Sequence, residues 1–305
     1  MTQQTPRSAG ETDEAVAPRA IDLEAGRRAF IRTLGFGAAG AAVMAAAGPN
    51  PAAAQTPTEV DVLNFALNFE YLGAEFYLRA TTGRGLPDNQ TTGTGTLGPV
   101  SGGEKARFSS TVVRGLAREL AEDETGHVRV LRGALGRAAI ARPAINLGTA
   151  FTAAARAAGV VPANGNFNPY SGDFAFLLGA FIFEDVCVTA LIGAAGLLRT
   201  PSVIATAAGF LAVESYQAGA IRTLLYSRGF TVQANKISNA RDSLDGAPAL
   251  DQGISTNNGS ANIVPADELS LAFGRTPQQV LQIAYLNRAR RPGGFFPNGV
   301  NGDIR

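Results

Sequence analysis

Apolar side chains recur at every third or fourth position over four long stretches of this chain, which is the spacing of α-helices that bury one side. The four stretches span residues 58–80, 101–135, 173–198 and 200–229. Thr58 and Ser101 each have a carboxylate three residues later, and Thr200 precedes a proline, all of which are helix-start signals. The pattern predicts an all-α protein built on four long helices.

The connections between these stretches predict how the helices pair. A Gly/Thr-rich loop at 81–103 joins the first two helices, and a tight turn around Arg199 joins the last two. Between these pairs lies a long connection at 136–172, which can run the length of a helical bundle. We therefore expect a four-helix bundle within residues 56–230, made of two antiparallel hairpins joined by one long crossover.

Residues 231–305 are predicted to form a loop-rich C-terminal extension. Thr276 and Pro277 mark the start of one short amphipathic helix. Its predicted apolar side consists of Val280, Leu281, Ala284 and Tyr285. No chemistry is predicted for the rest of the extension.

Residues 1–55 have the pattern of an export signal. Arg27 and Arg28 precede a Gly/Ala-rich apolar run at 33–48, and the alanines at 52–54 offer a cleavage site. The region resembles a twin-arginine signal, which implies export of the folded protein to the periplasm or the extracellular space. The apolar run is short for a membrane span, so no stable span is expected after cleavage. An uncleaved amphipathic anchor is the alternative.

Charge and cysteine content exclude several classes of protein. The formal net charge of +1 gives no support to nucleic-acid binding. The single cysteine, Cys187, excludes an internal disulfide bond and a cysteine-based zinc site. Cys187 itself is expected to be a small core residue.

Each predicted helix carries one glutamate inside its apolar stripe. These are Glu70, Glu124, Glu184 and Glu214. The positions three and four residues away are mostly apolar or small, except that His127 shares the face of Glu124 and Gln217 shares the face of Glu214. By contrast, Glu122 is expected on a solvated face and Glu75 on a mixed face.

Four carboxylates in apolar stripes require partners, because buried charges are paired, protonated or bound to metal. Two divalent cations would balance the four negative charges, whereas arginines or hydroxyls from neighbouring helices are the alternative partners. Spacing favours convergence of the carboxylates. The midpoint of Glu184 and Glu214 falls at the predicted turn at Arg199, and the midpoint of Glu70 and Glu124 falls in the first loop.

These motifs resemble the ferritin-like superfamily and, more narrowly, the exported desiccation-related ferritin-like proteins. The matching positions are Glu70 with Tyr77, Glu124 with His127, Glu184 alone, and Glu214 with Gln217. The resemblance implies a core site for two metal ions, iron or manganese, with Tyr77 and Tyr216 near the ligands. Gln217 replaces the second histidine, so one metal position is expected to be weak, to be empty or to hold a harder cation.

Two classes of function remain open at this point. One is an oxidase or peroxide-consuming enzyme with a pair of metals, acting in oxidative or desiccation stress. The other is a non-catalytic envelope, stress or interaction protein with a degenerate metal site. In the interaction case, the helix from Pro277 is expected to dock on a partner or on a second copy in a homo-oligomer.

Overall fold

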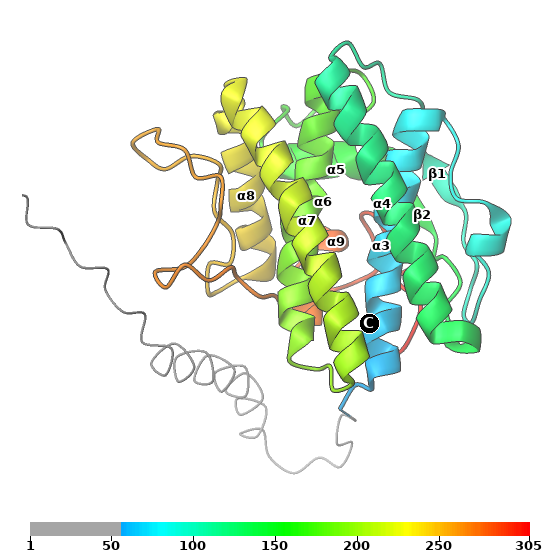
Figure 1. Cartoon of the computed structure of the whole chain (residues 1–305). Coiled ribbons are helices and arrows are strands. Elements are labelled where there is room, and N and C mark those ends of the chain that lie inside the picture. The colour runs from blue at the N-terminus through cyan, green and yellow to red at the C-terminus, as the bar shows by residue number, and fades with distance from the viewer. Residues whose placement is uncertain (1–55) are drawn as a thin grey trace, which may run out of the picture. The chain divides into compact units, whose positions relative to one another are not determined.

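Four long helices form the bundle in this computed structural model, which describes residues 56–305. They are α3 (Glu59–Thr82), α4 (Thr111–Leu135), α6 (Asp173–Ala195) and α7 (Pro201–Ser227). Helix α3 packs mainly against α4, and α6 packs mainly against α7 (Figure 1). The predicted all-α bundle is confirmed, and the predicted export signal lies outside the described residues.

The first and fourth helices begin at their predicted positions. The Thr58 hydroxyl accepts a hydrogen bond from the Asp61 amide at 3.2 Å, and the Asp61 carboxylate accepts one from the Thr58 amide at 2.7 Å. Pro201 is the first residue of α7, but the Thr200 hydroxyl does not cap its own helix. It donates to the Glu59 carboxylate at 2.5 Å. Glu59 therefore ties the first turn of α3 to the turn between α6 and α7.

The predicted start of the second helix at Ser101 is wrong. Ser101 lies in a short strand, and α4 begins ten residues later, where the Ser110 hydroxyl accepts a hydrogen bond from the Val113 amide at 3.4 Å. Gly102 has a φ of 75°, and a Cβ there would lie 2.6 Å from the Gly148 backbone nitrogen. The strand that contains Ser101 pairs with residues 145–147. A capping pattern depends on near neighbours and could not reveal so distant a partner.

The segments between helices add small elements on the outside of the bundle. They comprise β1 (Val100–Gly102), β2 (Ile145–Leu147), α5 (Thr149–Ala157), η2 (Asp88–Gln90) and η3 (Gly136–Ala138). Strands β1 and β2 pair in parallel, with Ser101 opposite Asn146. The crossover from α4 to α6 is therefore fastened to the loop between α3 and α4.

The C-terminal extension contains more regular structure than the sequence predicted. It holds α8 (Thr231–Asp245) as well as the expected α9 (Pro277–Ala284). Helix α8 was missed because it is rich in Asn, Ser and Thr, which have low helix propensity, and because its buried side includes Ser238 and Arg241. Helix α9 begins with the predicted cap at Thr276.

A buried ionic network joins the extension to the bundle. Its members are Asp185, Arg222, Arg241, Asp245, Asp251 and Arg275. Asp185 on α6 accepts from Arg222 on α7 and from Arg241 on α8, each at 2.8 Å. The three arginines and three aspartates balance in charge, which is how buried ions are normally accommodated.

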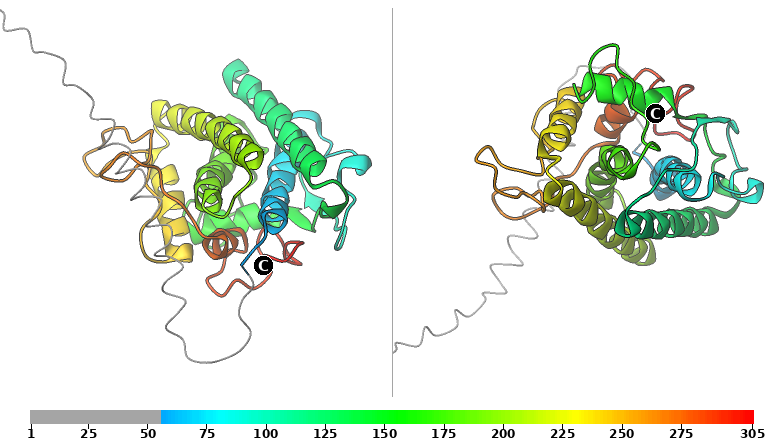
Figure 2. Two further views of the ribbon diagram at one scale, coloured as in Figure 1. Left: turned by 60° about the horizontal axis from the view of Figure 1, so that its bottom comes forward. Right: turned by 90° about the horizontal axis from the view of Figure 1, so that it is seen from above.

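Helix α6 lies at the centre of the described elements. It contacts α3, α4, α7, α8 and α9, and the view from above in Figure 2 shows these helices around it. In residues 56–305, α6 is the one helix long and apolar enough to cross a membrane, but 67% of its apolar window is buried within the protein. Its apolar character on all sides therefore fits a core helix.

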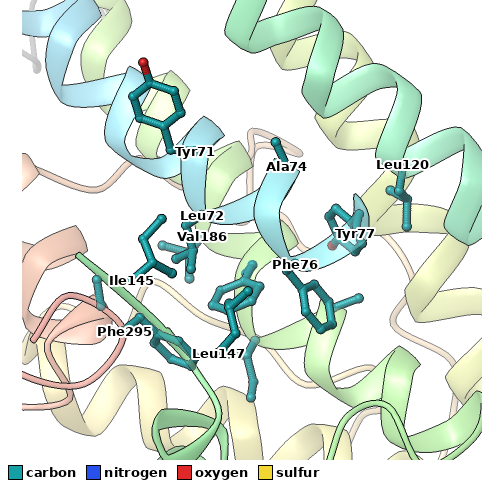
Figure 3. Packing of buried hydrophobic residues seen from close by; sticks show 14 of the residues in the cluster. Tyr71, Leu72, Ala74, Phe76, Tyr77, Leu120, Ile145, Leu147, Val186 and Phe295 are labelled. Carbon is teal, nitrogen blue, oxygen red and sulfur yellow. The ribbon is translucent and has the colours of Figure 1, made fainter. Parts of the chain in front are cut away.

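The hydrophobic core is shared by the bundle, the crossover and the extension. Phe76 of α3 packs against Phe151 of α5 and Phe183 of α6 at ring-centroid distances of 5.1 and 5.7 Å. Phe295 of the extension packs against Phe151 and Phe183 at 5.1 and 4.8 Å. Figure 3 shows Phe76 and Phe295 among the buried side chains of this core. Aromatic pairs of this kind position α3 and α6, both of which carry candidate site residues.

Candidate metal centre

Each long helix places one buried acidic side chain toward the middle of the bundle. We name Glu70, Glu124, His127, Glu184 and Glu214 the core cluster; these residues come from α3, α4, α4, α6 and α7 and are at most 7% exposed. One ligand atom from each of Glu70, Glu124, His127 and Glu214 lies within 4.8 Å of the others. The predicted convergence is thus present for Glu70, Glu124 and Glu214, whereas Glu184 is not a member of this group.

His127 links the two hairpins. Its Nδ1 atom lies 3.2 Å from Glu70 Oε2 and 3.2 Å from Glu214 Oε1. Its ring stacks on Phe210 of α7 with a centroid distance of 4.1 Å. Burial alone would lower the pKa of His127, but the hydrogen bonds with Glu214 and Glu70 outweigh it and raise the pKa to about 10. A cation at this position would replace that proton, because only a deprotonated imidazole nitrogen binds metal.

Glu124 sits directly over a glycine of α3. A Cβ on Gly73 would lie 2.4 Å from Glu124 Oε2, so the absence of a side chain makes room for this carboxylate. Burial, followed by the charges of Glu214 and Glu70, raises the pKa of Glu124 well above its usual value of 4.5. Gly73 is a supporting residue that the sequence placed on the face of Glu70 but did not assign a role.

Glu184 contacts Tyr77 and Glu214. It is not one of the four residues whose ligand atoms lie within 4.8 Å of one another. The Tyr77 hydroxyl donates a hydrogen bond to Glu184 Oε1, while Glu184 Oε2 has no partner. Burial and the charge of Glu214 raise the pKa of Glu184 well above 4.5. Burial also raises the pKa of Tyr77, so its hydroxyl stays protonated and remains a donor. The structure thus places Tyr77 beside a candidate ligand, as the sequence led us to expect.

Gln217 is buried and bridges α7 to α4. Its Nε2 atom donates to Asp123 Oδ2 at 3.0 Å, and its Oε1 atom is buried without a partner. Nothing in the sequence had singled out Asp123. By contrast, the expected position of Tyr216 near the ligands is wrong: the side chain is 81% exposed. Two residues from Glu214, it lies on the opposite side of the helix.

Glu75 shows how this protein pairs a buried carboxylate without metal. It is fully buried, contrary to the predicted mixed face, and binds Arg142 as well as Arg79, the latter at 2.9 Å. In the described part of the chain, no arginine or lysine forms such a pair with the core cluster. The arginine-pairing alternative therefore applies to Glu75 and fails for the four predicted glutamates.

A small apolar cavity adjoins the carboxylates. It has a volume of about 40 Å³ and is lined by Glu124, Glu184 and Cys187 together with apolar side chains of α3, α6 and α9. Those apolar side chains include Leu72, Ile182, Val186, Val280 and Ile283. The C-terminal extension thus forms one wall of the space next to the site.

The donor set fits divalent metal ions. Three buried carboxylates and one imidazole converge, and Glu184 adjoins Glu214. Glu184 Oε2, Glu214 Oε2 and Gln217 Oε1 are buried without hydrogen-bond partners. Carboxylate and imidazole ligands suit iron and manganese, and bound cations would remove the repulsion that raises the carboxyl pKa values.

Comparison with known proteins assigns the family. The model of the ferritin-like domain matches residues 58–227, which cover all four long helices. The chain therefore belongs to the ferritin-like domain family.

Two relatives illustrate the relationship. The chain is similar to the ferritin-like catalase Nec2 of Nesocodon mauritianus, with 30% identity over 81% of this chain and 84% of the relative. It is similar to the desiccation-related protein PCC13-62 of Craterostigma plantagineum, with 31% identity over 80% of this chain and 83% of the relative. No solved structure matches it significantly.

Proposed function

We propose that this chain is an exported ferritin-like protein that binds one or two iron or manganese ions in its bundle and acts in oxidative or desiccation stress. The observation that carries the proposal is the core cluster itself, which buries four carboxylates with no lysine or arginine counter-ion among the described residues. Export rests on the twin-arginine pattern around Arg27 and Arg28.

The residues divide naturally into two halves of a metal centre. Glu70, Glu124 and His127 would hold one ion, and Glu184 with Gln217 would hold the other. Glu214 adjoins both halves, because its Oε1 lies 3.2 Å from His127 Nδ1 and its carboxylate lies beside that of Glu184.

The reaction we propose is the disproportionation of hydrogen peroxide, in which two peroxide molecules give two waters and one dioxygen. Redox-active ions would supply and take back the electrons exchanged between the peroxide molecules. The cavity beside Glu124 and Glu184 has room for water-sized molecules, and therefore for peroxide. The name of one relative includes catalase activity, which supports this choice.

The residues around the cavity would shape that reaction. Without a bound ion, the Glu124 carboxyl, whose pKa is raised by burial and by neighbouring carboxylates, holds a proton that a cation would displace. Tyr77 keeps a donated hydrogen bond on Glu184 Oε1 and so orients the carboxylate on the cavity wall. The apolar wall from α3, α6 and α9 limits access of bulk water.

Gln217 supports a second candidate, a stress or envelope protein that binds metal without turnover. An amide oxygen is a weaker ligand than an imidazole for iron, so the second half could retain an ion without redox cycling. The related proposal that α9 docks on a partner loses its basis, because Val280, Leu281, Ile283 and Ala284 are buried within this chain.

Metal analysis of the full chain tests the proposal. After anaerobic loading with Fe²⁺ or Mn²⁺, we expect about one to two ions per chain, and fewer in Glu124→Gln, because it replaces a buried carboxylate ligand with a neutral, weaker amide. Glu122→Gln is the matched control, since it makes the same change on an exposed neighbour. Absence of bound metal, or equal binding by the two variants, refutes metal binding at the core cluster.

Oxygen evolution distinguishes the two candidates. With peroxide added to the loaded protein, an oxygen electrode should record one dioxygen for every two peroxides consumed. Metal binding without oxygen evolution supports the non-catalytic candidate. In that case Gln217→His should introduce metal oxidation that the parent protein lacks.

A further inference from the structure

Unpartnered oxygens concentrate in one half of the core. In residues 56–305, six buried side-chain atoms lack a hydrogen-bond partner, and three of them are Glu184 Oε2, Glu214 Oε2 and Gln217 Oε1. All three belong to the hairpin of α6 and α7, and Gln217 lies one helical turn from Glu214 on the same face. Since a buried oxygen without a donor is costly, these atoms mark a place for a cation.

The other half of the core differs in its donor atoms. There His127 contributes a ring nitrogen, which contacts Glu70 at 3.2 Å, and Glu124 also contacts Glu70. The half formed by Glu184, Glu214 and Gln217 has carboxylate and amide groups. Its unpartnered atoms are all oxygens.

The hydrogen bond between Gln217 and Asp123 determines which amide atom faces away from α4. Asp123 Oδ2 lies 3.0 Å from Gln217 Nε2, and an ionised carboxylate can only accept a hydrogen bond. The amide NH₂ group must therefore point toward Asp123, which leaves the carbonyl oxygen on the other side. That oxygen is the buried, unpartnered Oε1 atom, and Gln217 as a whole is only 5% exposed.

We propose that Asp123 is a positioning residue that holds the Gln217 amide oxygen as a metal ligand, so that the second half of the centre binds its cation through oxygen alone. This inference rests on the proposed metal binding and adds the class of ion. An oxygen-only set favours Mn²⁺ or Mg²⁺, whereas the half with His127 better suits Fe²⁺ or Zn²⁺. The two metal positions therefore differ in their donor atoms and in the ions that they favour.

Asp123 would act in the way that outer carboxylates act on metal-bound histidines. Such partners fix the orientation of a ligand, and their loss typically lowers metal affinity about 10- to 100-fold. Without Asp123, the Gln217 amide could rotate and present its NH₂ group, which cannot bind a cation. The effect should be confined to the second ion, because within residues 56–305 Asp123 forms no hydrogen bond or ion pair with His127 or Glu70.

The test is calorimetric titration of the metal-free full chain with Mn²⁺ and, separately, with Zn²⁺, with bound metal counted by mass spectrometry. We expect two binding steps in the parent protein. Asp123→Ala should weaken the second step about 10-fold or more and leave the first within about twofold. Asp123→Asn keeps an acceptor oxygen and should restore most of the second step. Glu122→Ala, an exposed neighbour of Asp123, is the control and should change neither step.

Gln217 provides an independent pair of variants should Asp123→Ala fail to fold. Gln217→Met keeps the side-chain volume but removes the oxygen, and should abolish the second Mn²⁺ step. Gln217→His should shift that step toward Zn²⁺ over Mn²⁺. An undiminished second step in Asp123→Ala or in Gln217→Met overturns the inference, as does Asp123→Asn behaving like Asp123→Ala. A parent protein that shows only one binding step refutes this inference. A parent protein that binds no metal refutes the proposed function as well.

Discussion

Gly73→Ala should weaken metal binding without lowering the stability of the metal-free bundle. Gly73 lies inside α3, where alanine normally stabilises a helix by about 0.5–1 kcal/mol relative to glycine. However, the new Cβ would lie 2.4 Å from Glu124 Oε2 and 2.8 Å from its Cδ. The atoms in its way form the end of a flexible side chain, so the helix can remain while the carboxylate moves.

The required displacement can be worked from those contacts. Ordinary Cβ contacts begin near 3.4 Å, so Glu124 Oε2 must retreat by about 1 Å, roughly twice the tolerance of a metal or catalytic site. We expect metal affinity to fall about 10- to 100-fold, which corresponds to about 1.4–2.7 kcal/mol of binding free energy. The metal-free variant should unfold at a temperature no lower than that of the parent.

Gly115→Ala on α4 is the control, because a Cβ there meets no atom within 4 Å. It should gain the same helix stability and bind metal like the parent. The assay is thermal unfolding of both variants without metal and with Mn²⁺, together with a Mn²⁺ titration. If Gly73→Ala binds Mn²⁺ as tightly as Gly115→Ala does, then the reasoning that Gly73 holds the Glu124 carboxylate in place is wrong.

Three further predictions test the surroundings of the site. Tyr77→Phe removes the donor to Glu184 and should lower the unfolding free energy of the metal-free protein by about 1–3 kcal/mol, measured in urea; an unchanged value contradicts the role of this hydrogen bond. Asp185→Ala leaves Arg222 and Arg241 without their shared carboxylate and should cost about 3–5 kcal/mol in the same assay, whereas a loss below 1 kcal/mol would show that Asp251 compensates. The third prediction concerns pH: burial and mutual repulsion raise the carboxyl pKa values of Glu124, Glu184 and Glu214 above 4.5, and the imidazole pKa of His127 rises to about 10. The folded metal-free chain then binds more protons than the unfolded chain. The contribution of these protons to the unfolding free energy is therefore fully present below about pH 4.5 and is lost as the pH rises. The unfolding temperature should therefore fall between about pH 5 and pH 8 without metal and recover with Mn²⁺; a rise without metal would contradict the shifts.

Local sequence signals predicted well where the relevant neighbours lie within one helix. The apolar stripes around Glu70, Glu124, Glu184 and Glu214 identified the buried carboxylates because helix periodicity determines which residues share a face. The cap at Thr58 was predicted for the same reason, since its partner lies three residues away.

Signals failed where the deciding contact came from a distant segment. Ser101 has a capping pattern but pairs with the crossover as a strand, and α8 forms although its sequence favours loops. Glu75 appeared to lie on a mixed face, yet Arg142, which is far along the chain, makes its full burial possible. In each case tertiary contacts outweighed local propensity.

Helix periodicity alone predicted that four helices each bury one glutamate and that His127 shares the face of one of them. These are consequences of periodicity, which depends only on near neighbours. Tertiary structure alone decided that no arginine among the described residues reaches those carboxylates, that Gly73 makes room for Glu124, and that Asp123 holds Gln217. The reason is physical: the partner of a buried polar group is chosen by proximity in space, and helices from distant parts of the chain supply it.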